Sequence, residues 1–203
     1  MNLRGTYRKA EINKALSGRP TLQNQISALR RQVNSQKPET QYFRVGSNHT
    51  STGTVVEQKN HLCTDSLISS TNFRDKVTGD EWCNKMLRMK FNFEPDCEYA
   101  RIIVYVPKKA GDRFTPSTFK TVTHPDPSSF WTITDFYMNK GEGNPQKNRQ
   151  ITKSVSLRKL KTIYDSNAAA VTKGEVIITV IMKPSTNATL QYSLGYELVY
   201  NNL

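Results

Sequence analysis

The sequence has few of the residues that build disulfide frameworks and metal sites. Only three cysteines and three histidines occur among its 203 residues. The cysteines are odd in number and none belongs to a C-x-x-C pair, while the histidines have no second ligand at the spacing of a metal site. We therefore expect free thiols at Cys63, Cys83 and Cys97, no bound metal and no cofactor.

The sequence also lacks long apolar runs and catalytic motifs. Without an apolar run, we expect neither a secretory signal nor a membrane span, and hence no membrane partner. The G-x-G of GEGNPQ (141–146) has no third glycine, and Pro145 opposes the helix that a dinucleotide site requires. No G-x-S-x-G nucleophile motif occurs. We therefore expect a protein that is not an enzyme.

Acidic residues are too few to balance the basic ones. The chain carries 29 Lys and Arg against 17 Asp and Glu, a net charge of +12. More than half of the excess lies in residues 1–50, which hold nine basic and two acidic residues. Such an excess is typical of proteins with a polyanionic partner, and we expect nucleic acid. The candidate phosphate-binding residues here are Arg4, Arg8, Lys9, Lys14, Arg19, Arg30 and Arg31.

One helical pattern lies inside this basic region. In PTLQNQISALRRQVNSQ (20–36), four apolar residues recur at helical spacing, namely Leu22, Ile26, Leu29 and Val33. The stripe is too thin to stabilise a short helix alone, so it needs other arms, the body or a bound polyanion to pack against. We expect residues 1–52 to form a basic arm that is partly helical or disordered.

From residue 53 onward the apolar residues alternate with polar ones, which predicts strands. The clearest alternation places Leu87, Met89 and Phe91 on one face, and Leu194 and Tyr196 on another. Gly, Pro, Asn and Asp separate the segments, a pattern typical of an all-β sandwich or barrel. A short helix is expected near 69–77. Eight strands are expected, over 53–58, 85–93, 99–106, 130–136, 149–157, 159–165, 174–183 and 189–200.

A second basic run, KNRQITKSVSLRKLK (147–161), contains no acidic residue. Its candidate nucleic-acid-binding residues are Lys153, Arg158, Lys159 and Lys161. Two interpretations stay open: a solvated strand face, or a surface that meets phosphates. Because no aromatic residues alternate with these cations, the run does not indicate base stacking.

The order of these features resembles the single jelly-roll capsid proteins of small icosahedral viruses. The resemblance rests on GTVVEQ (53–58), on FRDKVTGDEW (73–82) before the next strand, and on RIIVYVPKKAGDRFTPST (101–118). The sequence is similar in layout to the coat proteins of satellite tobacco necrosis virus type. It is also similar to those of circular single-stranded DNA viruses that encode a replication initiator. The arginines are scattered over a partly helical arm, which is nearer the satellite-virus pattern than a dense arginine block.

The resemblance implies a fold and a role. It implies an eight-stranded jelly-roll shell domain over 53–203, with loops that contact neighbouring copies, preceded by the arm over 1–52. About sixty copies would then assemble into an icosahedral shell around a single-stranded genome, with DNA favoured over RNA. The protein would belong to the virion and assemble in the host cytoplasm or nucleus. A non-viral β-sandwich module that binds nucleic acid or carbohydrate as a small oligomer remains the alternative.

Overall fold

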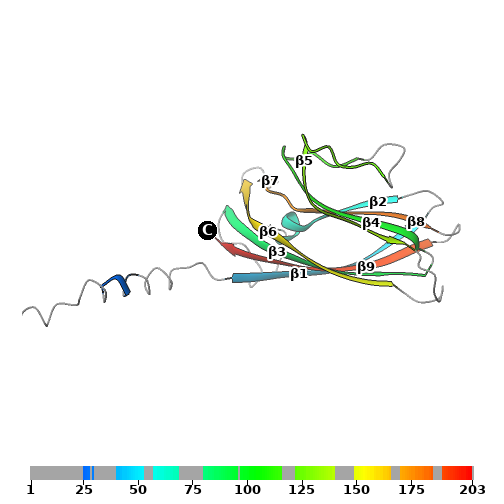
Figure 1. Ribbon diagram of the computed structural model, residues 1–203, viewed down its shortest axis with the longest axis horizontal. Helices are drawn as coiled ribbons and strands as arrows, with labels where there is room; N and C mark the ends of the chain where they lie inside the picture. The colour runs from blue at the N-terminus through cyan, green and yellow to red at the C-terminus, as the bar shows by residue number, and fades with distance from the viewer. Residues whose placement is uncertain are drawn as a thin grey trace, which may run out of the picture. The chain divides into compact units, whose positions relative to one another are not determined.

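A computed structural model describes most of the chain beyond its first forty residues (Figure 1). The described residues are 25–27, 29, 40–52, 57–68, 80–95, 97–115, 122–139, 149–165, 170–184 and 189–202. The chain divides into two compact units, Met1–Pro38 and Glu39–Leu203. Within the described residues no helix is long and apolar enough to cross a membrane.

The second unit consists of two antiparallel sheets packed face to face (Figure 1). The five-stranded sheet has the order β1 (Thr40–Thr52), β9 (Thr189–Asn202), β3 (Glu81–Phe93), β6 (Arg149–Asp165) and β7 (Ala170–Lys173). The four-stranded sheet has the order β2 (Glu57–Leu62), β8 (Ile177–Pro184), β4 (Cys97–Pro107) and β5 (Phe130–Asn139). A short helix, α3 (Cys63–Ile68), follows β2.

The strand pairs are nested in the chain. The first strand pairs with the last in β1·β9. In sequence order, that pair encloses β2·β8, which encloses β3·β6, which encloses β4·β5. Two further pairings, β3·β9 and β4·β8, join these pairs within each sheet. This is the strand order of a jelly roll, so the prediction of an all-β jelly-roll sandwich is confirmed.

The predicted boundary of the arm at residue 52 is wrong. Residues 40–52 form β1, which pairs with β9 over its whole length, and the unit that contains it begins at Glu39. The sequence pattern missed this strand because few of its residues are apolar. Phe43 is buried and Val45 packs against the core, whereas Ser47 and His49 continue the same face with polar side chains.

The two strands predicted over 149–157 and 159–165 are one strand, β6. A bulge explains the apparent break, because the residues between Ser156 and Leu160 face only Lys85 on β3. Within the bulge Arg158 and Lys159 have φ angles of 48° and 60°, a left-handed conformation that side-chain-bearing residues rarely adopt. The predicted count of eight strands therefore combined two missed strands, β1 and β7, with one strand divided in two. The helix expected at 69–77 lies outside the described residues.

The main core lies between the sheets and uses the faces that the alternation predicted. Leu87, Met89 and Phe91 on β3 are buried, as are Leu194 and Tyr196 on β9. The three cysteines are free thiols, and two of them, Cys63 and Cys97, are buried. Burial raises the pKa of the Cys63 thiol far above its usual range.

A second, smaller core lies on the other face of the four-stranded sheet. It explains why β4 and β8 are apolar on both faces. Phe114, from the segment after β4, packs with Ile103, Tyr105 and Ile181. The Phe114 backbone N–H donates to the Tyr105 hydroxyl at 3.0 Å, and its carbonyl accepts from Gln58 Nε2 at 2.6 Å. The described start of this loop thus covers its own sheet, whereas the expectation was contact with neighbouring copies.

A buried histidine connects the two sheets. His61 on β2 is 8% exposed, and its Nε2 lies 2.7 Å from the hydroxyl of Tyr192 on β9. The ring of His49 lies 4.3 Å from that of His61, centre to centre. Burial, with the nearby His49 and Lys59, lowers the pKa of His61 from 6.5 to about 4. The imidazole is therefore neutral in the folded protein at neutral pH.

We predict that acid destabilises the fold through His61. Between pH 6.5 and about 4 the unfolded chain binds a proton at His61 that the folded chain does not. The free energy of unfolding should therefore fall as the pH falls through this window, by about 2 kcal/mol. Chemical denaturation of the protein and of His61→Gln at both ends of the window tests this. Equal losses in the two proteins would contradict it.

Candidate nucleic-acid interface

The outer face of the five-stranded sheet presents polar and charged side chains in rows. Antiparallel pairing places residues of neighbouring strands directly opposite one another, and opposite residues share a face. One row runs across four strands from Arg44 through Glu197 and Arg88 to Ser154. These side chains alternate along their strands with core residues such as Met89 and Tyr196. The register that fills the core therefore also builds this row.

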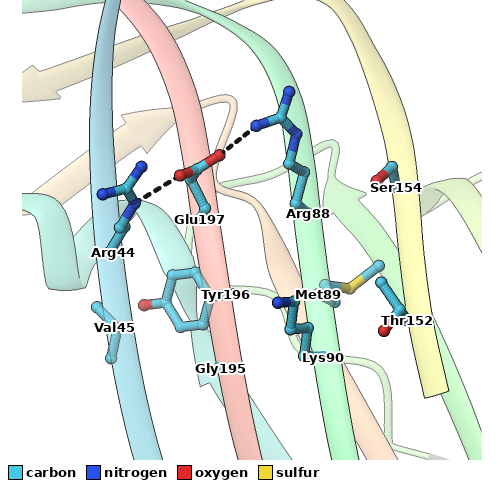
Figure 2. A pocket seen from close by; sticks show the side chains of 10 residues that line it. All are labelled: Arg44, Val45, Arg88, Met89, Lys90, Thr152, Ser154, Gly195, Tyr196 and Glu197. Atoms are coloured by element: carbon cyan, nitrogen blue, oxygen red, sulfur yellow. Dashed lines mark hydrogen bonds and ion pairs between the residues drawn. The ribbon is translucent and has the colours of Figure 1, made fainter. Parts of the chain in front are cut away.

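Two arginines share one carboxylate in the row (Figure 2). Arg44 Nε lies 2.5 Å from one oxygen of Glu197, and Arg88 Nη1 lies 2.6 Å from the other. The hydrogen bond from Arg44 is the largest cause that lowers the pKa of the Glu197 carboxyl, and Arg88 adds to it. The Glu197 side chain is 14% exposed, against 75% for Arg44 and 51% for Arg88. The carboxylate orients the guanidinium groups, which remain accessible to solvent.

The next row contains two glycines side by side. Gly46 on β1 pairs with Gly195 on β9, which pairs with Lys90 on β3, and Thr152 on β6 completes the row. At Gly195, where a side chain is missing, the face is hollowed. The hollow has a volume of about 400 Å³, and its lining includes Gly195, Lys90 and Thr152 of this row and all four residues of the first row (Figure 2). We call it the glycine hollow.

A third row continues the surface with hydroxyl and amide groups. It consists of Asn48, Ser193, Asn92 and Gln150. A second hollow of about 260 Å³ adjoins the first and shares Lys90, Thr152 and Gly195 with it. The charged residues that line the two hollows are three cations and one carboxylate. The face can therefore donate hydrogen bonds to an anion, from guanidinium, ammonium and hydroxyl groups.

The structure does not bring the predicted cations of β6 together. Lys153 lies opposite the core residue Met89, and its ammonium group is 5.6 Å from the centre of the Phe136 ring. Lys161 is in an ion pair with Glu81 at 2.6 Å. Arg158 lines a separate hollow of about 310 Å³ beside Trp131 on β5, and Lys159 is exposed in the bulge. The four residues therefore do not form one cluster, and their binding to nucleic acid stays a prediction.

The predicted cations of the arm lie outside the described residues. These are Arg4, Arg8, Lys9, Lys14, Arg19, Arg30 and Arg31. Of the four predicted packing residues, Leu22 and Val33 also lie outside, whereas Ile26 and Leu29 are described and helical. Ile26 is 42% exposed and Leu29 is 59% exposed. Their packing role and the binding role of the arm therefore stay predictions.

Sequence reasoning missed Arg44, Arg88 and Lys90 as candidate site residues. The alternation of KMLRMKFNF (85–93) already placed Arg88 and Lys90 together on the polar face of a strand. Arg44 was assigned to the arm, because β1 was not recognised. Their common row depends on which strands are neighbours, and β1, β9 and β3 are far apart in the sequence.

The sequence matches no protein-family model and no curated protein sequence. Solved structures with a similar fold include the BFDV capsid protein in its decameric form, with 10% identity and a TM-score of 0.45 over 81% of this chain and 98% of that chain. A chain of Desmodium yellow mottle tymovirus has 15% identity and a TM-score of 0.42, covering 82% and 89%. A chain of turnip yellow mosaic virus has 12% identity and a TM-score of 0.42, covering 82% and 83%.

We predict that the Glu197 cluster contributes little to stability. Because Arg44 and Arg88 are exposed, Glu197→Gln should lower the free energy of unfolding by less than about 1 kcal/mol. The control is Glu175→Gln, since Glu175 is buried and binds Arg113 through both oxygens at 2.9 and 3.1 Å. That change should destabilise the protein more than Glu197→Gln does, because it removes the carboxylate that both terminal nitrogens of Arg113 contact. Equal losses in chemical denaturation would show that Glu197 has a structural role.

Proposed function

We propose that this protein is a capsid subunit that assembles into a closed shell and packages single-stranded nucleic acid. The observation that supports this best is the combination of a jelly-roll unit with a strongly basic segment before it. Residues 1–38 hold eight Lys and Arg against one acidic residue, whereas residues 39–203 hold 21 against 16. A folded unit that repeats can form a closed surface, and a basic segment on each copy offers phosphate-neutralising charge to an enclosed genome.

The proposal assigns separate tasks to the two units. The jelly roll makes the contacts between copies. The smallest shell with icosahedral symmetry contains about sixty copies. The arm binds the genome through Arg4, Arg8, Lys9, Lys14, Arg19, Arg30 and Arg31, without regard to base sequence. The protein then belongs to the virion. DNA as the genome rests on the sequence resemblance alone, and nuclease digestion of the packaged nucleic acid decides between DNA and RNA.

We predict that the purified protein forms closed particles of uniform size. Electron microscopy and light scattering across a range of salt concentrations measure this directly. A species of one or two subunits under all of these conditions would contradict the proposal. That result would favour the alternative, a β-sandwich binding module that acts as a small oligomer.

We predict that the arm carries most of the packaging. Deletion of residues 2–35 should leave a folded second unit, because that unit has its own core, but particles with little nucleic acid. Replacing only Arg30 and Arg31 with Ala should reduce packaging in part and weaken its dependence on salt. The measurement is the ultraviolet absorbance of nucleic acid relative to protein in purified particles. Equal nucleic-acid content with and without the arm would contradict the prediction.

A further inference from the structure

We propose that the outer face of the five-stranded sheet, centred on the glycine hollow, binds the phosphate backbone of single-stranded nucleic acid. The residues that would contact phosphate are Arg44, Arg88 and Lys90, with hydroxyl groups from Thr152 and Ser154. The proposal rests on the proposed function for the presence of a genome. It adds a binding surface on the folded unit to the one expected on the arm.

The charges of the face are complementary to a phosphate chain. Three cations line the two adjoining hollows against the single carboxylate of Glu197. That carboxylate engages one nitrogen of Arg44 and one of Arg88. A guanidinium has five N–H donors, so each arginine keeps donors for a phosphate oxygen while its position is fixed. The exposed side chain of Lys90 lies in the next row along β3.

The paired glycines are not required by the fold. Neither Gly46 nor Gly195 has a positive φ angle. A Cβ atom at Gly46 would meet nothing within 4 Å, and one at Gly195 would meet only the Val45 carbonyl oxygen at 3.9 Å. Glycine inside a strand weakens the sheet and often marks a place where a ligand approaches the backbone closely. Here the missing side chain at Gly195 makes room for a group to approach between the cations.

An exposed aromatic ring on the same face favours single-stranded nucleic acid over an acidic protein segment. Tyr42 lies two residues before Arg44 on β1, so both side chains point outward, and Tyr42 is 48% exposed. A cationic groove beside an exposed ring is the combination that binds single strands, because bases stack on the ring while phosphates follow the cations. Hydroxyl and amide groups of Asn48, Ser193, Asn92 and Gln150 continue the face on the other side of the hollow, and such groups are common partners of phosphate and sugar.

Photo-crosslinking of the full chain tests the placement. A short oligodeoxythymidine that carries 5-bromodeoxyuridine is bound, irradiated and mapped by mass spectrometry. We expect crosslinks in the peptide that contains Tyr42, in addition to any in the arm. Crosslinks confined to the arm would overturn this inference and leave the proposed function standing.

Substitutions in the full chain test the mechanism. Tyr42→Ala should weaken oligodeoxythymidine binding roughly fivefold or more. Arg88→Ala and Lys90→Ala should each lower the slope of log affinity against log salt by about 0.7. The matched control is Lys109→Ala, an exposed cation in the turn after β4, which should change neither quantity. If the Arg88, Lys90 and Lys109 variants all behave alike, the inference is wrong.

Filling the hollow separates binding from folding. Gly195→Thr adds a side chain that the subunit can accommodate, so its melting temperature should be unchanged or higher while oligonucleotide binding weakens. Gly195→Ala serves as the smaller change and should have the same effects to a lesser degree. Unchanged oligonucleotide binding in both variants, together with lost particle assembly, would show that the face contacts another copy of the chain and would overturn the inference.

Discussion

The pairing of the first strand with the last is the constraint on which the rest of this unit depends. β1 and β9 are paired residue for residue from Thr40↔Asn201 to Thr52↔Thr189. That register brings Phe43 and Val45 into the core and, because side chains alternate, turns Arg44 and Gly46 outward. A shift of one residue would exchange the two sets. The core and the cationic face are therefore two consequences of the same hydrogen-bond ladder.

The strands with a clear apolar alternation could be predicted from the sequence, since their inner side chains are apolar without interruption. β3 and β9 are examples, and their buried faces agree with the prediction. β1 could not be recognised, because its inner face ends in Ser47 and His49, which the interior accommodates through Tyr192 and His61. Similarly, the bulge at Arg158 and Lys159 could not be recognised, because a glycine usually marks a positive φ angle and both of these residues are cations with side chains.

The candidate site was harder to predict than the fold, for a physical reason. Arg44, Glu197 and Arg88 are brought together only by neighbouring strands that lie far apart in the sequence. The count of basic residues drew attention to charge, but the side chains of a run of cations along one strand point to both faces of the sheet. Lys153 illustrates this, since it lies over the Phe136 ring instead of joining Lys161. Proximity across strands, not along them, determines which charges act together.

The irregular course of β6 has a consequence for how the protein behaves at high concentration. Among the described residues, β6 is paired on both sides only at its end, where it meets β7, so most of its length is an open sheet edge. An open edge can pair with the edge of any other chain and start uncontrolled strand-to-strand growth. The left-handed pair Arg158 and Lys159 interrupts the regular spacing of backbone donors and acceptors, and its charges repel a second copy of the same edge. This irregularity therefore protects the open edge of β6 against the strand-to-strand pairing that leads to fibrous aggregates.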